Sequence, residues 1–476
     1  MCGFVGVIGD EHVATSAVLS LQAIQHRGQD AAGLGVWNDR RVSIQKGLGL
    51  ISQAVPASRV AAFEGSVAIG HVRYPTAGAE STAEDAQPFR SRWPGVLLAH
   101  NGNLTNVPEL KHWLREQGVV VLSECDAEPL LLTFTRALNR ERPAGHTRED
   151  VIGAVREVYA RVKGAYSTVI ALEVDGEPTL VSFRDPHGIR PGVYGQRDDG
   201  AWFVASESVA LDVHGVVKTD DLPVGEVLFL RANQPAMKVS VQKNERRHCI
   251  FERIYFARAD SHMEDGRINR SRFRFGRRLA QEWAARGFEI DLVVAVPDTS
   301  RPAAMAIAEE LGVPHREGFI KNRYSGRTFI MPNQAARDAA LRLKLNPIPE
   351  MFRGKRVLLV DDSVVRGSTM RRIVQMLRQL EPEAIHLGIF SPPVRNPCFY
   401  GIDMPTREEL VAASYDQDRL EAVLNERFGT DSVTYLSLEG LRETAEVPMC
   451  DACFSGDYVI PVTDSERAYI QGERRQ

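Results

Sequence analysis

The segment VLLVDDSVVRGSTM, residues 357–370, constrains the fold of this chain more than any other. Its four consecutive apolar residues predict a strand buried on both faces, and a short loop separates this strand from a helix predicted to start near Ser368 or Thr369. The segment DLVVAVPD, residues 291–298, repeats the order of strand, loop and helix. Strands that alternate with helices in this way form a parallel sheet with helices on both faces. We therefore predict an α/β domain in the second half of the chain.

Two adjacent carboxylates end the first of these strands, and a loop of small residues follows them. Backbone N–H groups in such a loop and at the start of the next helix form an anion site suited to a monophosphate. The carboxylates can accept hydrogen bonds from the hydroxyls of a ribose. The segment thus predicts a phosphosugar cradle, and the alternative is a strand that ends in a charged turn. The residues assigned to this cradle are Asp361, Asp362, Ser363, Arg366, Gly367, Ser368 and Thr369.

The first half of the chain has a different pattern. Short apolar segments such as FVGVI, SVAIGHV and WFVASE are separated by Gly, Pro, Asn and Asp, which predicts a strand-rich domain with helices between some strands. A chain of 476 residues is too long for one ordinary core. We therefore predict two domains, residues 2–235 and 236–476, with the boundary after the strand EVLFL.

Cys2 directly follows the initiator methionine, so removal of Met1 would place its thiol beside a free α-amino group. An α-amine with a pKa of about 7.7–8.0 can act as the base that activates a thiol. The turns HRGQDAAG, HVRYPTAG, LAHNGNLTN and SECDAE place polar side chains beside predicted strands, where catalytic groups commonly lie. They favour a nucleophilic role for Cys2 over the alternative that they are only well-capped turns.

Together with MCGFVGVIG, these turns resemble the glutamine amidotransferase domain of the N-terminal-nucleophile hydrolases, an α+β sandwich. The resemblance implies that Cys2 attacks the side-chain amide of glutamine and releases ammonia through a thioester. Asn101 and the backbone N–H of Gly102 would form the oxyanion hole for the tetrahedral intermediate. Arg73 would bind the α-carboxylate of glutamine, and Asp126 would hold its α-ammonium group.

Five further positions bear on glutamine binding. Arg27 and Thr76 match surrounding positions of the family pattern, with roles that the resemblance leaves open. The sequence departs from the pattern at Val72 and Pro75, where a threonine and usually a serine are expected. It departs again at Asp85, where asparagine is common. These departures concern the affinity for glutamine and leave each assigned catalytic group in place.

The phosphosugar cradle resembles the motif by which type I phosphoribosyltransferases bind 5-phosphoribosyl 1-pyrophosphate (PRPP), and AVPDTSRPAA resembles their pyrophosphate loop. The resemblance implies that Thr299, Asp361 and Asp362 occupy positions associated with Mg²⁺. The stretch FIKNRYSGRTFIMPNQ resembles the loop that closes over PRPP. Its Lys321 and Arg323 would contact PRPP, and closure would let cations stabilise the departing pyrophosphate. A solvated surface loop is the alternative for these basic residues.

Both halves resemble one family across almost the whole chain, the glutamine PRPP amidotransferases. The implied reaction, the first committed step of purine synthesis, converts glutamine, PRPP and water into 5-phosphoribosylamine, glutamate and pyrophosphate. The resemblance further implies feedback inhibition by purine nucleotides, a homotetramer, and a protected path for ammonia between the two sites. One alternative is an amidotransferase with another acceptor, such as a sugar phosphate. The predicted phosphosugar cradle argues against it. A nucleotide-sensing regulator without activity is the other, and Cys2, Asn101 and Asp126 argue against it.

Cys249, Cys398, Cys450 and Cys453 supply four thiols, the last two in a C-x-x-C pair. Disulfides are not expected in a long chain without an export signal. Spacing alone leaves open an iron–sulfur cluster, structural zinc or buried thiols. The four positions match the subgroup of the family that holds a [4Fe–4S] cluster, so the resemblance implies that cofactor. Cys125 belongs to neither set and is predicted to be a plain buried thiol.

The charge pattern gives no reason to expect a nucleic-acid or membrane partner. The net charge is −4, and the N-terminus lacks the basic start and long apolar stretch of a signal peptide. The apolar runs are only as long as strands, so we expect a cytoplasmic enzyme.

The segment RINRSRFRFGRR, residues 267–278, carries six arginines. Phe273, Gly276, Ala280 and Trp283 fall on one side of a helix. We interpret the segment as an amphipathic helix with arginines in solvent or at a subunit contact. A feedback site for nucleotide phosphates is the functional alternative.

Overall fold

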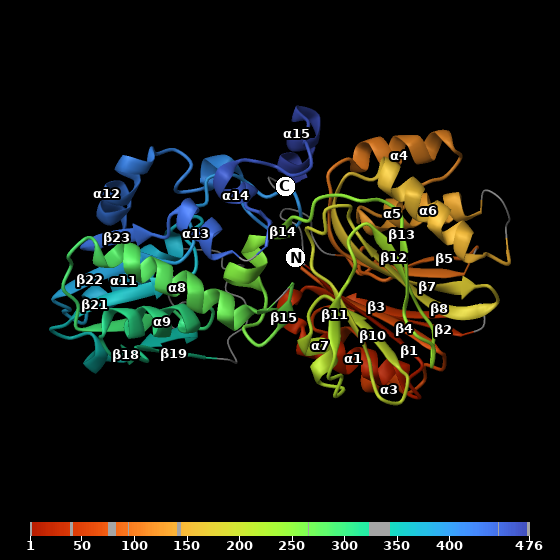
Figure 1. Ribbon diagram of the computed structural model, residues 1–476, viewed down its shortest axis with the longest axis horizontal. Helices are drawn as coiled ribbons and strands as arrows, with labels where there is room; N and C mark the ends of the chain where they lie inside the picture. Colours follow the sequence, from red (N-terminus) through yellow and green to blue (C-terminus); the bar gives the residue numbers. More distant parts are fainter. Residues whose placement is uncertain are drawn as a thin grey trace.

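The computed structural model describes residues 2–38, 41–74, 82–93, 95–139, 144–264, 266–322, 343–445 and 447–473. Two bodies lie side by side along the longest axis, the first half of the chain in red to yellow and the second in green to blue (Figure 1). The N-terminus lies between them. Within the described ranges, no helix combines the length and apolar character needed to cross a membrane.

The first domain contains two antiparallel sheets. The strands of the first sheet lie in the order β11 (Thr219–Asp221), β9 (Val193–Gln196), β10 (Trp202–Ala205), β1 (Gly3–Ile8), β4 (Val67–Arg73), β2 (Ala31–Asn38) and β3 (Arg41–Leu48). Those of the second lie in the order β13 (Met237–Ser240), β12 (Glu226–Leu230), β8 (Glu177–Arg184), β7 (Gly164–Val174), β6 (Val96–Leu104) and β5 (Phe89–Ser91).

The two sheets pack face to face, and helices cover their outer faces (Figure 1). Ile69 of β4, Leu97 of β6 and Val169 of β7 meet in the apolar core between the sheets. The first sheet is covered by α1 (Val13–Ala23) and α7 (Val209–Asp212), and the second by α4 (Val107–Glu116), α5 (Ala127–Leu138) and α6 (Arg148–Arg161). Every residue of β1 is buried because that strand lies between the inner core and α1. The predicted α+β sandwich is confirmed.

The second sheet continues beyond residue 235, where the sequence places the domain boundary. β13 forms an antiparallel pair with β12, from Glu226 opposite Ser240 to Phe229 opposite Met237. Met237, Lys238 and Ser240 are exposed and only Val239 is partly buried, so this short edge strand gives a weak apolar signal.

The second domain is built on a parallel sheet in the order β18 (His315–Arg316), β17 (Leu292–Ala295), β21 (Arg356–Asp361), β22 (Ala384–Ile389) and β23 (Ser432–Tyr435). One face packs on α8 (Ile268–Ala284) and α9 (Arg301–Leu311), and the other on α11 (Ser368–Arg378) and α12 (Gln417–Phe428). In β21, Leu358 and Val360 face the first pair of helices, whereas Val357 and Leu359 face the second. The predicted α/β domain is therefore confirmed, and burial on both faces explains the unbroken apolar run VLLV.

Helix α8 contains the arginine-rich segment. Gly276, Ala280 and Trp283 are buried as predicted, whereas Phe273 is only half-buried and Phe275 and Leu279 are buried instead. Arg272 is also buried rather than in solvent, because its guanidinium donates to the carbonyls of Arg253 (3.0 Å) and Ala257 (2.7 Å). The buried stripe is thus centred nearer Leu279 than the sequence indicates.

The opposite side of α8 faces outward. Phe273 lines a surface hollow together with Arg270, Arg274 and Arg277. A nucleotide site on this helix remains a prediction.

Short elements complete the fold and connect the two domains. Strand β14 (His248–Cys249) pairs in parallel with β24 (Met449–Cys450), bringing distant parts of the chain together between the domains. The remaining elements are η1 (Gln25–Arg27), α2 (Ile51–Ala54), α3 (Ala57–Val60), η2 (Glu252–Phe256), β15 (His262–Met263), β16 (Gly266–Arg267), β19 (Phe319–Lys321), β20 (Leu345–Pro347), η3 (Pro349–Met351), η4 (Arg407–Glu409), α13 (Leu438–Thr444), α14 (Ala452–Ser455) and α15 (Asp464–Glu473).

Candidate active sites

Cys2 lies immediately before β1, at the edge of the first sheet where β4 ends. Its half-buried thiol has Sγ 3.8 Å from the carbonyl oxygen of Tyr74. Its backbone nitrogen donates to Oδ1 of Asn101 at 3.3 Å. Its carbonyl oxygen accepts a hydrogen bond from Nε of Arg27 at 3.0 Å. The residue predicted to be the nucleophile is therefore held at its nitrogen and at its carbonyl, while the thiol faces the end of β4.

Asn101 of β6 carries an amide donor without a partner. The side chain is fully buried, and Nδ2 has no hydrogen-bond acceptor among the described residues. A buried N–H group without a partner is costly, so such a group suits a ligand that brings negative charge. Because Oδ1 already accepts from Cys2, Nδ2 is the atom that remains for an oxyanion.

The backbone N–H of Gly102 points away from the neighbouring strand β7. The N–H groups two residues on either side, of His100 and Leu104, donate to Gln87 (2.7 Å) and Asp126 (3.0 Å). Since alternate residues of a strand direct their N–H groups to the same side, the N–H of Gly102 points the same way. A Cβ at this position would lie 2.0 Å from the carbonyl oxygen of Ala165, which explains the glycine.

Arg73 and Asp126 place opposite charges at this site. Arg73 ends β4, and its buried Nη1 has no hydrogen-bond partner in the described part of the chain and lies 3.9 Å from Oδ2 of Asp85. Asp126 precedes α5, where Oδ1 lies 3.1 Å from Nε2 of His100. Burial acts to raise the pKa of Asp126, but His100, the Leu104 N–H and Arg73 lower it below its usual value. The carboxyl group is therefore anionic and suited to an ammonium group.

Arg27 is fully buried between two glutamates. Its Nη1 donates to Glu207, and Nη2 lies 2.7 Å from Oε1 of Glu252 in the second domain. Burial acts to lower the pKa of Arg27, but these carboxylates raise it above its ordinary value. In this structure Arg27 contacts the Cys2 backbone, so its part in glutamine binding remains a prediction. Thr76 lies outside the described residues.

Three residues of this site were not identified from the sequence. Glu207 and Glu252 hold Arg27 from distant segments, and His100 holds Asp126. His100 lies within the motif AHNGNL, but nothing in its spacing indicates that its ring faces Asp126. The two glutamates carry no sequence signal, because their role depends on contacts between segments far apart in the chain.

The phosphosugar cradle lies at the carboxyl end of β21. Oδ1 of Asp361 accepts from Oγ of Ser300 (3.2 Å) and from the backbone nitrogen of Asp362 (2.9 Å). Oδ1 of Asp362 accepts from Oγ of Ser363 at 2.6 Å. Burial and the neighbouring Asp362 raise the pKa of Asp361 well above its usual value, and burial raises that of Asp362 to about 6. Two crowded acids of this kind fit a divalent cation or the hydroxyls of a sugar.

Gly367 connects this loop to α11. Its φ of +75° is in the left-handed region, and a Cβ would lie 2.8 Å from the ring of Phe428, so no other residue fits without strain. Helix α11 starts at Ser368, and its first N–H groups have no partner within the helix, as an anion site requires. Arg366 beside it forms an ion pair with Glu409 at 3.1 Å.

The predicted pyrophosphate loop follows β17. Thr299 lies in the turn before α9, next to the Ser300 that contacts Asp361. Lys321, at the end of β19, pairs with Asp298 of the same turn. The structure therefore brings Thr299 and Lys321 to the cradle region, whereas Arg323 lies outside the described residues.

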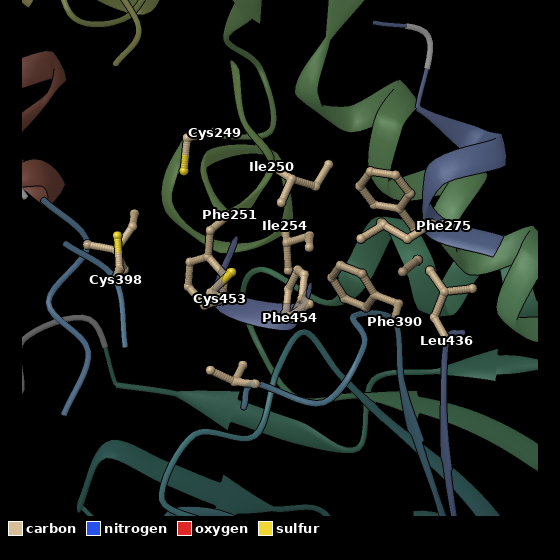
Figure 2. Close-up of a cluster of buried hydrophobic side chains, with 14 of the residues drawn as sticks. Cys249, Ile250, Phe251, Ile254, Phe275, Phe390, Cys398, Leu436, Cys453 and Phe454 are labelled. Carbon is tan, nitrogen blue, oxygen red and sulfur yellow. The ribbon is translucent and has the colours of Figure 1, made fainter. Parts of the chain in front are cut away.

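The four cysteines of the predicted cofactor site, Cys249, Cys398, Cys450 and Cys453, are buried and form no disulfide bonds. Burial raises the pKa of Cys249 to about 11 and those of Cys450 and Cys453 well above the usual value, and neighbouring thiols of the set raise all three further. Burial acts to lower the pKa of Arg190, but negative charge on Cys249, Glu252, Cys398 and Cys450 raises it above its ordinary value. Figure 2 shows that Cys249, Cys398 and Cys453 come from separate segments. The four thiols all belong to one buried cluster of the second domain.

In the described ranges, no three His, Cys, Asp or Glu side chains are placed to hold a metal ion. Four buried thiols are the donor set that both structural zinc and an iron–sulfur cluster use, so the cluster remains a prediction. Cys125 is separate and buried, with a raised pKa.

Two family models match the chain. A glutamine amidotransferase domain matches residues 73–213, and a phosphoribosyl transferase domain matches residues 268–393. The first range contains Arg73, Asn101, Gly102 and Asp126 but begins after Cys2, and the second contains the phosphosugar cradle.

Full-length relatives match as well. The chain is 38% identical to an amidophosphoribosyltransferase of Methanothermobacter thermautotrophicus, covering 98% of this chain and 96% of the relative. It is 41% identical to one of Pseudomonas aeruginosa, covering 99% and 95%. The solved structure of glutamine PRPP amidotransferase from B. subtilis complexed with ADP and GMP is 37% identical, with a TM-score of 0.85 over 97% of this chain and 98% of that one.

Proposed function

This chain belongs to the amidophosphoribosyltransferase family, and we propose that its two sites carry out the two halves of that reaction through the residues described above. The enzyme transfers ammonia from glutamine to PRPP, which is the first step of purine biosynthesis. Glutamine, PRPP and water yield 5-phosphoribosylamine, glutamate and pyrophosphate. The observation that carries the residue assignment is the hydrogen bond from the Cys2 nitrogen to Oδ1 of Asn101, whose buried Nδ2 has no partner among the described residues.

In the glutaminase half, the Cys2 thiol attacks the side-chain carbonyl of glutamine once Met1 has been removed. The α-amino group takes the thiol proton, and the Asn101 amide and Gly102 N–H stabilise the oxyanion. The C–N bond then breaks, the proton passes to the leaving nitrogen as ammonia departs, and water hydrolyses the thioester to glutamate. Arg73 and Asp126 bind the α-carboxylate and α-ammonium groups of glutamine, so their role is orientation.

In the transferase half, the loop at Gly367 and the start of α11 bind the 5-phosphate, while Asp361 and Asp362 face the ribose hydroxyls. Ammonia forms a bond to the anomeric carbon as the bond to pyrophosphate breaks. Lys321 is placed to approach the leaving group from the neighbouring turn. The roles of Arg323 and Thr76 remain predictions.

Two cofactors belong to the proposal. Mg²⁺ would be held near Thr299, Asp361 and Asp362, where it would neutralise the charge of pyrophosphate. A [4Fe–4S] cluster would be held by Cys249, Cys398, Cys450 and Cys453, a choice supported by the burial of all four thiols in one cluster. Four irons per chain after anaerobic purification would support the cluster, whereas zinc without iron would overturn it.

Regulation and assembly are also proposed. The B. subtilis relative was solved in complex with ADP and GMP, which supports purine nucleotides as feedback inhibitors here. A homotetramer and a cytoplasmic location remain predictions from the sequence.

The variant Cys2→Ser tests the division into two sites. We expect it to abolish glutamine-dependent formation of 5-phosphoribosylamine and to retain the ammonia-dependent reaction, because only the first needs the thiol. Pyrophosphate release, measured once with glutamine and once with ammonia, reports the two activities separately. Loss of both activities in a folded protein would contradict the proposal.

A further inference from the structure

The carbonyl group and Cα of Gly102, the residue whose N–H belongs to the proposed oxyanion hole, contact the second domain at Gly401. A Cβ at Gly401 would lie 3.0 Å from the carbonyl carbon of Gly102 and 3.1 Å from its oxygen. Gly401 has a φ of +104°, in the region that favours glycine. The two backbones therefore touch without side chains between them.

The next residue of the strand strengthens this contact. Nδ2 of Asn103 donates to the carbonyl oxygen of Phe399 at 3.1 Å. Consecutive residues of β6 are thus held by the segment Cys398–Gly401 of the other domain.

The segment Cys398–Gly401 is itself firmly held. The Tyr400 hydroxyl donates to the carbonyl of Ile460 (2.6 Å) and accepts from the nitrogen of Ile460 (2.9 Å). The backbone nitrogen of Tyr400 donates to Sγ of Cys398 at 3.3 Å. Phe399 and Tyr400 are each 1% exposed, so the segment has no room to shift alone.

Gly102 has a second neighbour on its other side. The carbonyl of Ala165 in β7 leaves no space for a side chain there. Gly102 is therefore confined between β7 and Gly401, and the direction of its N–H depends on both. An oxyanion hole stabilises the intermediate only when its donors are fixed where the negative charge develops. The confinement of Gly102 should therefore favour stabilisation of the oxyanion.

Asn101 is connected to the cysteine region by another route. Asn101 pairs with Ser167 of β7, whose Oγ donates to the carbonyl of Arg190 at 2.9 Å. The carbonyl of the preceding Ile189 accepts from the nitrogen of Cys249 at 3.1 Å. Gly102 thus contacts the segment that carries Cys398, and Asn101 is linked through Ser167 and residues 189–190 to Cys249.

We propose that the segment Cys398–Gly401 is a positioning element of the glutaminase oxyanion hole. It contacts the backbone of Gly102 and the side chain of Asn103, so it acts through these residues and not on glutamine. This inference rests on the glutaminase half of the proposed function. Its consequence is that the second domain, which binds PRPP, also fixes a donor in the first.

The variant Gly401→Ala tests this. The new methyl group would displace the Gly102 peptide, so the glutamine-dependent kcat should fall by on the order of 10–100-fold. The KM for glutamine should change by less than about threefold, because Arg73 and Asp126 bind the α-carboxylate and α-ammonium groups of glutamine. Ammonia-dependent synthesis should be unchanged. Alkylation of Cys2 by iodoacetamide, followed by mass spectrometry, should also keep its rate, because that reaction forms no oxyanion.

Gly429→Ala is the matched control. Gly429 has a φ of +76°, and a Cβ there meets nothing within 4 Å, so it reproduces the backbone strain without the contact. Asn103→Asp is a second variant, which replaces the donor facing the Phe399 carbonyl on a half-buried residue. It should give the same pattern as Gly401→Ala and decides the question if Gly401→Ala fails to fold.

Three outcomes would overturn the inference. The first is a normal glutamine-dependent kcat in a folded Gly401→Ala or, if that variant does not fold, in Asn103→Asp. The second is a rise in KM with kcat unchanged. The third is an equal loss of glutamine- and ammonia-dependent activity at an unchanged melting temperature. Retained ammonia-dependent activity in any variant shows that the proposed function itself stands.

Discussion

The backbone nitrogen of Cys2 and Oδ1 of Asn101 lie 3.3 Å apart. On removal of Met1 this nitrogen becomes the α-amine that serves as base, so one amide side chain contacts the base through its oxygen. Its Nδ2 remains without a partner among the described residues. A single residue therefore orders the nucleophile and offers a donor to the oxyanion.

The variant Asn101→Asp separates these two functions. It keeps an oxygen for the Cys2 nitrogen but replaces the Nδ2 donor by an acceptor. The glutamine-dependent kcat should fall by about 10²–10³, as when a donor is removed from an oxyanion hole. Ammonia-dependent activity should not change. A variant with full glutaminase activity would show that Nδ2 does not stabilise the intermediate.

Replacement of Asp126 tests glutamine binding. Asp126→Asn removes the negative charge that His100 and the Leu104 N–H stabilise, so the α-ammonium group loses its counter-charge. The KM for glutamine should rise by about tenfold or more, with a smaller change in kcat. Glu124→Gln is the control, since that side chain is exposed and pairs only with Lys111 among the described residues. A fall in kcat at constant KM would assign Asp126 to the chemical step instead.

The buried ion pairs of Glu207 predict a pH dependence of stability. Burial acts to raise the pKa of Glu207, but His26 and Arg27 lower it far below the usual value of 4.5. The charged form is favoured in the folded state, so its stabilisation is complete above pH 4.5 and is lost as the pH falls toward the depressed pKa.

The variant Glu207→Gln should therefore be less stable than the wild type at pH 7, by about 3 kcal/mol. The difference in stability should shrink as the pH is lowered below 4.5, because Glu207 then binds a proton in the unfolded wild type but not in the folded one. Chemical denaturation at several pH values measures this. A difference in stability between Glu207→Gln and the wild type that stays constant from pH 7 to pH 3 would contradict a charged Glu207 in the folded state.

Much of the cradle was predictable because its signal is local. The strand, the two acids and the glycine before α11 are consecutive, and the structure brings Asp361, Asp362 and Gly367 together as the sequence indicates. The unbroken apolar run of β21 also predicts that its successive side chains pack alternately against the helices on either face of the sheet.

What escaped prediction depends on contacts between distant segments. Arg272 is buried because its guanidinium donates to the carbonyls of Arg253 and Ala257. The helical periodicity of its own segment gives no sign of these contacts. The contact between Gly102 and Gly401 joins the two domains, and each glycine alone reads as an ordinary turn or strand residue. Such pairings become visible only when the packing of the domains is known.

The variant Gly367→Ala tests the phosphate cradle. Alanine at a φ of +75° costs about 1–2 kcal/mol, and its methyl group would press on Phe428. The loop must then shift away from the start of α11, so the KM for PRPP should rise by about tenfold or more, while glutamine hydrolysis by the first domain should persist.

Gly312→Ala separates the contact from the backbone strain. Gly312 also has a positive φ, +68°, but a Cβ there meets nothing within 4 Å. It should lose similar stability with an unchanged KM for PRPP. Because both variants carry the same strained backbone, a difference in KM between them isolates the geometry of the anion-binding loop. Equal KM values for Gly367→Ala and the wild type would mean that the 5-phosphate does not bind at the N-terminus of α11.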